Sequence, residues 1–423
     1  GPARRGATPL RRHRCRPRAA GATAAPEAAM GCCSSSSKDV QTCERRRRLS
    51  VGHVDESAGG AAKDTETDED RGYIRDLHEE DILQMMDDGG TGARKFSIGS
   101  MTDQAKTSFA NKSIQNLGDK IDADSAGLGY TCRKGLKPES PNQDSWMVLK
   151  VDNDFSMYGV FDGHGKQGHD VSNYVKDLLP RLILKDSRFK TGGMKEMLVD
   201  CFKKAQTAVA SKDRASSPFA QMAGTTATLV LHDHSTDKGK GEITIAHVAD
   251  STCVVGFMKN NRMTAEQLTV DHKPNLKDER ARIEKAGGRV VFDGYTNHRV
   301  YARNGRYPGL NMSRCLGDLM GHAEAGLSAK PDVKVRNLNE NQDTILLVCS
   351  DGVWEFITPQ EALDIVWKTP RLKAMKMAET LAKEAWDRWI REEGGAVVDD
   401  ITVVLVDLDQ ASKKLRVCDN ALQ

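Results

Sequence analysis

The sequence predicts an α+β protein in which antiparallel sheets are covered by helices on their outer faces. Apolar runs at residues 225–231, 243–248 and 252–258 have the length of strands, and the short gaps between them suit hairpins. Helical stripes occur in separate pairs, which favours antiparallel sheets with helices packed outside. No run of about 18 apolar residues is present, so no membrane-spanning helix is predicted.

Composition divides the 423-residue chain into three parts. Residues 1–125 are polar and glycine-rich and are predicted to be a disordered extension, with a short helix near Ile82. Residues 126–410 have globular patterning, and residues 411–423 form a tail. Residues 1–29 suit either an Arg-rich transit peptide or sequence upstream of the true start, and we favour the second.

The patterning from residue 127 onward predicts each element in turn. Asp170 is expected to cap a helix whose apolar stripe runs over 171–182, and 194–205 repeats the same i, i+3, i+4 spacing. Both stripes are predicted to face the core. The remaining elements are a charged helix over 275–286 closed by a Gly pair, a buried strand over 344–349, a capping box over 358–361 that opens a helix, an amphipathic helix over 371–391 and a last strand over 401–408.

Charge and cysteine usage exclude several classes. The formal charge of +2 hides an asymmetry, because residues 1–50 hold twelve basic and three acidic side chains (+9) and the remainder therefore carries −7. A mildly acidic body argues against nucleic-acid binding. The ten cysteines include no C-x-x-C pair, so neither a zinc ribbon nor a disulfide scaffold is predicted, and Cys253 and Cys349 suit the reduced core of a cytosolic protein.

The segment that starts at Met30 fits the N-myristoylation pattern. Gly31 would become the amino terminus if translation began at Met30, and Cys32 and Cys33 are placed for palmitoylation. One myristoyl chain gives only marginal membrane binding, and the arginine cluster at 45–48 offers a further signal for an anionic surface. We therefore expect attachment to the cytoplasmic face of a membrane. The alternative is a disordered Ser-rich tail with chance cysteines.

The most informative stretch is the strand-like run at 155–161 followed by Asp162-Gly163-His164-Gly165. It places a carboxylate, a free carbonyl and an imidazole at a strand end, which are the parts of a divalent-metal site beside a proton donor. The same stretch matches the G-x-G-x-x-G dinucleotide pattern. That interpretation is disfavoured, because Asp162 would stand beside the pyrophosphate and no suitable second strand follows.

Five acidic residues share one context, the end of an apolar strand. A single such Asp is usually a turn former, but several on one sheet system would converge at one edge and repel one another unless cations were bound. Oxygen ligands without thiolates or paired histidines favour Mg²⁺ or Mn²⁺ over Zn²⁺. The five are Asp144, Asp162, Asp250, Asp351 and Asp399.

The order of these motifs resembles the metal-dependent type 2C protein phosphatases over about 127–409. The resemblance implies a four-layer α/β/β/α sandwich of two antiparallel sheets flanked by helices, with a flap at about 296–331 beside the metal cleft. The motifs are Asn-Gln-Asp144, Phe-Asp-Gly-His-Gly165, Gly-Thr-Thr-Ala227, Val-Ala-Asp-Ser251, Leu-Thr-Val-Asp-His-Lys-Pro274, Ser-Arg-Cys-Leu-Gly-Asp318, Ser-Asp-Gly-Val-Trp354 and Asp-Asp-Ile-Thr402.

The resemblance also implies a set of metal ligands. Asp162 would bridge two ions, the carbonyl of Gly163 would hold one of them, and Asp351 and Asp399 would complete the first ion's shell. Two further acids complete the set: Asp144 for ordering metal-bound water and Asp250 for a weaker third ion.

The other implied roles belong to His164, as general acid, and to a basic residue that holds the substrate phosphate. Arg133 is the first choice for the phosphate, with Lys134 and Lys137 as alternatives, since the loop to Asn142 is longer than usual for the family.

The implied activity is hydrolysis of phosphoserine and phosphothreonine in proteins by a metal-bridging hydroxide, in a monomer that binds no nucleic acid. The absence of a Cys-x5-Arg motif disfavours a cysteine-dependent phosphatase. Three positions depart from the common family pattern: Gln143, Ala249 and Asp400. None removes a core carboxylate, so an active enzyme is expected, and a non-catalytic membrane-tethered scaffold is the alternative.

Overall fold

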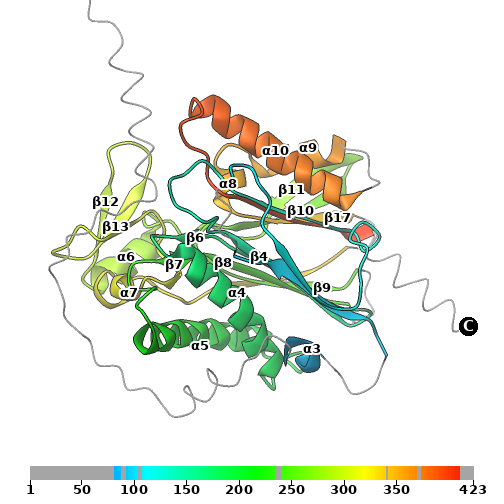
Figure 1. Ribbon diagram of the computed structural model, residues 1–423, viewed down its shortest axis with the longest axis horizontal. Helices are drawn as coiled ribbons and strands as arrows, with labels where there is room; N and C mark the ends of the chain where they lie inside the picture. Colours follow the sequence, from blue (N-terminus) through cyan, green and yellow to red (C-terminus); the bar gives the residue numbers. More distant parts are fainter. Residues whose placement is uncertain are drawn as a thin grey trace, which may run out of the picture. The chain divides into compact units, whose positions relative to one another are not determined.

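Two antiparallel sheets lie face to face in the computed structural model, and helices cover the outer face of each (Figure 1). The structure describes residues 81–86, 92–102, 107–234, 240–339, 342–368 and 373–409. The predicted lipidation segment at 31–33, the arginine cluster at 45–48 and the tail from 411 lie outside the described residues.

The first sheet has seven strands, and every neighbouring pair is antiparallel. Its central strands β4 and β5 are buried along their whole length, because both of their faces are covered. The strand order is β16 (Asp332–Asn337), β9 (Glu242–Val248), β8 (Ala227–Asp233), β5 (Phe155–Phe161), β4 (Ser145–Val151), β1 (Lys95–Ser100) and β2 (Ile114–Gly118).

The second sheet has five strands, also antiparallel. The inner faces of the two sheets form one apolar core, to which Trp146 and Tyr158 contribute from the first sheet and Val255, Leu346 and Val404 from the second. The strand order is β11 (Arg262–Gln267), β10 (Thr252–Lys259), β17 (Asp343–Cys349), β18 (Ile401–Asp407) and β3 (Leu128–Arg133).

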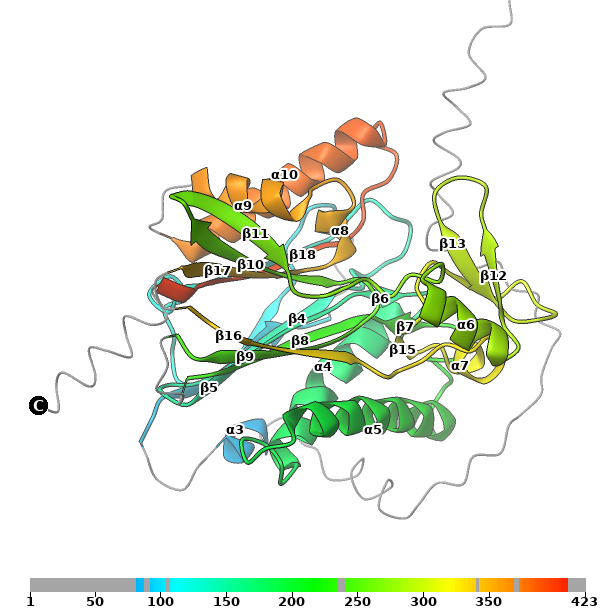
Figure 2. The ribbon, with the colours of Figure 1, turned by 180° about the vertical axis from the view of Figure 1, so that it is seen from behind.

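Two helix pairs form the outer layers. Helices α4 (Gly168–Lys185) and α5 (Met194–Ala215) bury their apolar stripes with residues of the seven-stranded sheet, whereas α9 (Pro359–Lys368) and α10 (Ala374–Glu392) pack on the five-stranded sheet. The two pairs lie on opposite sides of the sandwich (Figures 1 and 2). The predicted four-layer architecture is therefore confirmed.

Smaller elements gather at one end of the sandwich (Figure 2). One three-stranded sheet consists of β6 (Gly163–His164), β7 (Gly224–Thr225) and β15 (Leu316–Gly317). The other consists of β12 (Arg289–Phe292), β13 (His298–Tyr301) and β14 (Pro308–Leu310). The short helices here are α6 (Lys277–Lys285), α7 (Leu319–Glu324) and α8 (Asp351–Trp354). The predicted flap at 296–331 contains β13, β14, β15 and α7, but the sheet formed by β12, β13 and β14 begins earlier, at β12.

Of two helix starts predicted from sequence, one is confirmed and one is wrong. The capping box before α9 forms as predicted, since the Thr358 backbone N–H donates to Glu361 Oε2 (2.9 Å) and the Glu361 N–H donates to Thr358 Oγ1 (3.3 Å). Asp170 was predicted to cap α4, and this is wrong: α4 begins two residues earlier, at Gly168, so Asp170 lies within its first turn. An acid there still favours the helix dipole.

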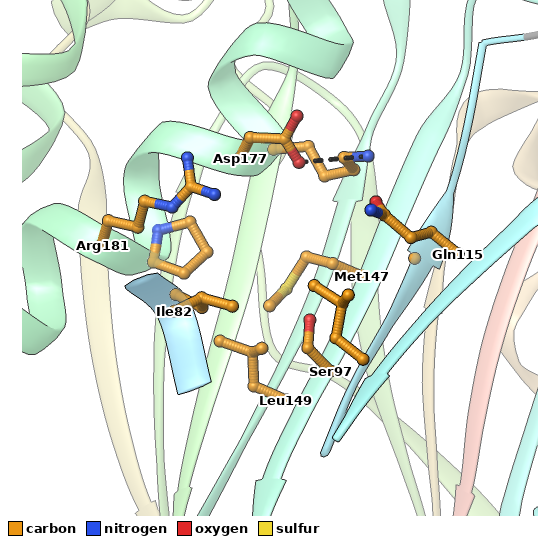
Figure 3. A pocket seen from close by; sticks show the side chains of 11 residues that line it. Ile82, Ser97, Gln115, Met147, Leu149, Asp177 and Arg181 are labelled. Carbon is orange, nitrogen blue, oxygen red and sulfur yellow. Dashed lines mark ion pairs between the residues drawn. The ribbon is translucent and has the colours of Figure 1, made fainter. Parts of the chain in front are cut away.

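The predicted boundary at residue 126 needs correction, because sheet strands β1 and β2 precede it. Phe96 and Ile98 of β1 are buried in the core between the sheets. Their alternation with polar neighbours is a strand pattern, but it is short and lies inside a polar region. The short helix predicted near Ile82 is confirmed as α3 (Asp81–Met85), and Ile82 lies beside Met147 and Leu149 (Figure 3). No helix among the described residues is long and apolar enough to cross a membrane.

Replacing Ile98 by Ala tests whether β1 is part of the folded domain. Ile98 is only 2% exposed, so the substitution should leave a cavity and lower the free energy of unfolding by about 2–5 kcal/mol. Urea denaturation measures this, with Ser97→Ala, on the half-buried opposite face of the strand, as the matched control. Equal stabilities of the two variants would show that β1 does not belong to the core.

Candidate metal centre and active site

Four of the predicted acids come from the ends of paired strands. Asp144 directly precedes β4 and Asp162 directly follows β5, and these strands are neighbours in the seven-stranded sheet. Asp351 lies two residues after β17, and Asp399 two residues before β18, which are neighbours in the five-stranded sheet. Since the sheets lie face to face, each contributes a pair of acids to one edge of the sandwich.

Five predicted site residues line one narrow cleft of about 80 Å³: Asp162, Gly163, His164, Asp351 and Asp399. Lys137 lies in the same cleft, as does strand β14 of the flap. The structure therefore brings together side chains that are more than 200 residues apart in the chain. Asp144 and Asp250 were predicted to belong to the same centre, and they lie outside the lining of this cleft.

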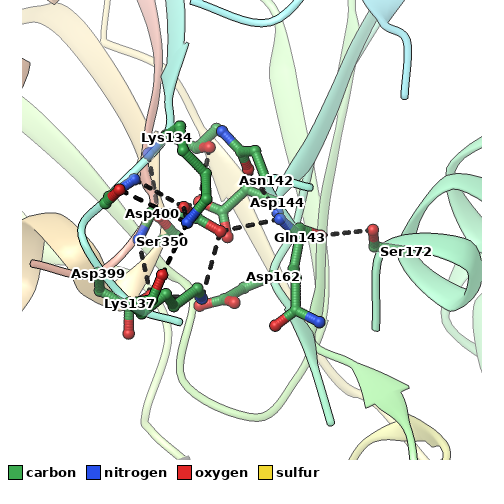
Figure 4. Close-up of polar contacts among 12 residues, drawn as sticks. Lys134, Lys137, Asn142, Gln143, Asp144, Asp162, Ser172, Ser350, Asp399 and Asp400 are labelled. Carbon is green, nitrogen blue, oxygen red and sulfur yellow. Dashed lines mark hydrogen bonds and ion pairs between the residues drawn. The ribbon is translucent and has the colours of Figure 1, made fainter. Parts of the chain in front are cut away.

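Asp144 is fully buried and ties the two sheets together (Figure 4). Its Oδ2 accepts hydrogen bonds from Ser350 Oγ (2.8 Å) and Thr402 Oγ1 (2.7 Å), both of which belong to the five-stranded side of the sandwich. Its Oδ1 is buried without a hydrogen-bond partner among the described residues. One carboxylate oxygen thus holds the sheets in register, while the other remains available to a cation or an ordered water molecule.

The carboxylates of this cluster repel one another. Burial and the neighbouring carboxylates Asp144 and Asp351 raise the pKa of Asp162 well above its usual value. Burial and the charges of Asp399 and Asp250 raise the pKa of Asp351 well above its usual value. Burial and the charge of Asp400 raise the pKa of Asp144 to about 6. A divalent cation would remove this repulsion.

The chemistry of the donors fits such an ion. Asp351 Oδ1, like Asp144 Oδ1, is buried without a hydrogen-bond partner among the described residues, and a buried carboxylate oxygen in that condition needs a proton or a metal. All of the clustered side-chain donors are carboxylate oxygens, which hard cations prefer. The residues present therefore suit Mg²⁺ or Mn²⁺.

Asp250 forms a neighbouring part of the centre. It is buried at the end of β9, where the Lys273 ammonium bonds its Oδ2, and its Oδ1 has no hydrogen-bond partner among the described residues. Its charge contributes to the raised pKa of Asp351, which places it close to the main cluster. Asp250 therefore lies near the main cluster, and the ammonium of Lys273 neutralises part of its charge.

Lys137 is the cation that the protein itself supplies to the cleft. Its Nζ lies 2.5 Å from Asp399 Oδ1 and 3.3 Å from Asp400 Oδ2 (Figure 4). Burial alone would lower the pKa of Lys137, but Asp399 and Asp400 raise it well above the usual value, so the side chain stays charged. The sequence analysis named Lys137 only as an alternative to Arg133 for the phosphate-binding position.

Arg133 was the first choice for the phosphate-binding position, but the structure places it outside the cleft. Its guanidinium packs over Phe109, donates to Thr131 Oγ1 (2.9 Å) and the Phe109 carbonyl (3.2 Å), and approaches Glu379 on α10. It does not line the cleft that holds Asp162. The cause is the pleat of β3, which directs Arg133 away from the metal edge, whereas the following loop returns Lys137 to it.

Two of the unusual family positions have structural roles that the sequence did not show. Asp400 accepts the backbone N–H groups of Gly135 and Gln143 (both 2.8 Å) and so holds both ends of the 135–143 loop. Burial opposes its ionisation, yet Lys137 and Lys134 lower its pKa below the usual value. Gln143 donates from Nε2 to the Gly165 carbonyl (2.6 Å) and therefore supports the backbone beside His164.

His164 is held by Asp318, a residue whose role the sequence analysis missed. The distance from His164 Nε2 to Asp318 Oδ2 is 2.6 Å, and both side chains are largely buried. Asp318 has a left-handed backbone (φ 43°), which a non-glycine residue adopts only when its surroundings enforce it. Strand pairing of His164 with Gly224 supplies the space, because a Cβ at Gly224 would lie 2.1 Å from Asp318 Oδ2 and 2.8 Å from His164 Nε2.

The fold has counterparts among solved structures. A serine-threonine phosphatase 2C from Toxoplasma gondii aligns with a TM-score of 0.56 at 20% identity, covering 66% of this chain and 94% of that one. A sex-determining protein from C. elegans aligns with a TM-score of 0.56 at 21% identity, covering 71% and 68%. At these identities the likeness concerns the fold alone.

Sequence comparisons extend the likeness to the family. The model of the family described as protein phosphatase 2C matches residues 136–393. Two Arabidopsis thaliana proteins are similar over most of their length: probable protein phosphatase 2C 35 is 30% identical over 310 residues (67% of this chain, 84% of the relative), and probable protein phosphatase 2C 34 is 32% identical over 311 residues (66% and 80%).

The fold and the carboxylate-lined cleft define a metal-dependent phosphatase. More specifically, the chain belongs to the protein phosphatase 2C family, whose members are serine/threonine phosphatases that depend on Mg²⁺ or Mn²⁺. The resemblance stated from the motifs is confirmed.

Replacing Gly224 by Ala tests whether the His164–Asp318 contact matters for turnover. The added methyl group would occupy the space between the two side chains, displace the imidazole and lower kcat by roughly 10- to 100-fold. Steady-state phosphatase kinetics measure the effect, and a thermal melt of the same preparation shows that the variant is folded. A folded variant with unchanged kcat would contradict a role for this contact.

Proposed function

We propose that this phosphatase hydrolyses phosphoserine and phosphothreonine in proteins at the cleft lined by Asp162, Asp351 and Asp399. The observation that carries the proposal is the convergence of these three acids beside His164, where Asp351 Oδ1 is buried without a hydrogen-bond partner among the described residues. Asp162, the Gly163 carbonyl, Asp351 and Asp399 would hold two divalent ions, and Asp250 a weaker third. Such ions acidify coordinated water and neutralise phosphate oxygens.

His164 would supply the proton that the departing serine or threonine oxygen needs. An ionised Asp318 can only accept hydrogen bonds, so it holds the proton of His164 Nε2. The other ring nitrogen, Nδ1, is buried without a hydrogen-bond partner among the described residues. When it is protonated, Nδ1 is therefore the nitrogen that can donate to the leaving oxygen, which is a poor leaving group without that proton.

Lys137 would bind the phosphate group of the substrate. Its ammonium lies in the cleft against Asp399 and stays charged, so it can attract an anion and orient it toward the acids. Asp144 would orient water with its unpartnered Oδ1, since its Oδ2 is already bonded to Ser350 and Thr402. The bonds to Asp400 keep the loop that carries Lys137 in place.

A phosphopeptide assay with Mn²⁺ tests these assignments together. Wild-type protein should release phosphate, and a chelator or the Asp162→Ala substitution should abolish release because the ligand set is broken. Lys137→Ala should lower kcat/KM by at least about tenfold, whereas its matched control Arg133→Ala should stay within about twofold of wild type.

The outcomes separate the alternatives. No turnover by the wild type at any metal concentration would favour the non-catalytic scaffold. Turnover that is lost in Arg133→Ala and kept in Lys137→Ala would restore Arg133 as the phosphate-binding residue. Sedimentation of the same preparations would test the predicted monomer.

We also propose attachment to the cytoplasmic face of a membrane through acylation at Gly31, Cys32 and Cys33. The support is the sequence pattern after Met30 and the arginine cluster at 45–48, which together provide more than one membrane signal. Phosphorylated proteins at that surface would then be the substrates.

Metabolic labelling with a myristate analogue tests this attachment. A protein that starts at Met30 should incorporate the label and distribute to the membrane fraction, and Gly31→Ala should abolish both. Replacing Cys32 and Cys33 by Ser should keep the label but weaken membrane retention, because one acyl chain anchors only marginally. Equal labelling of wild type and Gly31→Ala would refute acylation at this site.

A further inference from the structure

A second group of metal-binding side chains lies beside the carboxylate centre. His164 Nε2, Cys315 Sγ and an oxygen of Asp318 all lie within 4.8 Å of one another, a juxtaposition formed where β6, β7 and β15 meet α7 (Figure 2). Asp318 Oδ2 is the common point, at 2.6 Å from His164 Nε2 and 3.2 Å from Cys315 Sγ. The three residues offer one nitrogen, one sulfur and one oxygen ligand.

We propose that His164, Cys315 and Asp318 form an inhibitory site for a thiophilic divalent ion, Zn²⁺ above all, distinct from the Mg²⁺/Mn²⁺ centre. Zn²⁺ is bound by thiolate, imidazole and carboxylate groups, and sites with three protein ligands leave a fourth position open. Asp162, Asp351 and Asp399 offer carboxylate oxygens as ligands, whereas this site offers sulfur and nitrogen as well, so the two sites should select different metals.

The geometry requires only a small rearrangement. Ligand atoms around a tetrahedral zinc are separated by on the order of 3.5 Å, given bonds of about 2.0–2.3 Å. The separation between Cys315 Sγ and Asp318 Oδ2 is already close to this, and the His164–Asp318 pair must widen by about 1 Å. An ion entering between them would take the place of the two hydrogen bonds that Asp318 now accepts.

Access to the site comes from a cavity of about 620 Å³ whose lining does not include Asp162. His164 and Asp318 line it together with apolar residues that include Phe219, Met222 and Leu310. The open fourth position of the ion could therefore be filled by water from this cavity. Cys315 is fully buried and does not line this cavity, so an ion would meet His164 and Asp318 first.

Zinc binding would stop turnover because it occupies His164, and in this respect the inference rests on the proposed function. The ring proton would move to Nδ1, but the ion would replace the Asp318 contact on Nε2 and draw the imidazole out of the position from which it donates to the leaving oxygen. The Cys315 thiol would bind as thiolate and release its proton to solvent, so the exchange balances as one ion bound and one proton freed. Removal of zinc by a chelator would restore activity once Mn²⁺ is supplied again.

Zinc titration at saturating Mn²⁺ tests the effect on activity. Wild type should be inhibited, and additional Mn²⁺ should not relieve the inhibition. Cys315→Ser keeps a hydroxyl that can donate to Asp318, so it should remain active, yet its half-inhibitory zinc concentration should rise by at least about tenfold. The matched control is Cys201→Ser, at an equally buried cysteine on α5, and it should behave as wild type.

Cobalt spectroscopy tests the site without reference to catalysis. Co²⁺ should give a thiolate-to-metal charge-transfer band in wild type and in inactive Asp162→Ala, but not in Cys315→Ser. That result separates the inference from the proposed function, because the band needs no turnover. Equal zinc inhibition of wild type and Cys315→Ser, relief of inhibition by Mn²⁺, or absence of the band from wild type would each overturn the proposal.

Discussion

Mutual repulsion among buried carboxylates is the constraint on which this site depends. Asp162, Asp351 and Asp399 share a cleft at the edge of the sandwich, where burial and the neighbouring carboxylates make the charges of Asp162 and Asp351 costly. Lys137 offsets part of this charge, and divalent cations would offset the rest. Metal binding and the integrity of the sandwich edge are therefore coupled, since the same acids that would hold the ions terminate the core strands.

The sandwich meets this constraint by fixing the acids with bonds that do not compete with metal. Asp144 uses one oxygen to join the two sheets, through Ser350 and Thr402, and leaves the other unpartnered. Asp400 is occupied entirely with the loop that carries Lys137. His164 is likewise positioned by the contact between its Nε2 and Asp318 Oδ2. Buried polar contacts therefore position the side chains of the cleft.

Prediction from sequence succeeded where the signal was local or repeated. The apolar runs and the α9 capping box predicted the layers and a helix start, and the acids at strand ends predicted that Asp162, Asp351 and Asp399 would meet at one edge. Prediction from sequence failed where the pattern was short or lay in a segment of different composition. Strand β1 has the alternation of a half-buried strand, but its six residues lie in a polar stretch that reads as a linker. Arg133 and Lys137 could not be separated, because the direction of a side chain after a strand depends on the loop that follows.

By itself the sequence determined the family, most of the core strands after residue 127 and the acids available for metal binding, because these follow from periodicity and from motifs of fixed spacing. Only the tertiary structure decided which basic residue enters the cleft, how β1 joins the sheet and that Asp318 and Cys315 lie against His164. The side-chain contacts among these join residues far apart in the chain, such as His164 and Asp318 at a separation of 154, and β1 pairs with β4 across the loops and the strand between them. No local pattern encodes such a distance, since it is set by how the two sheets and their connecting loops pack together.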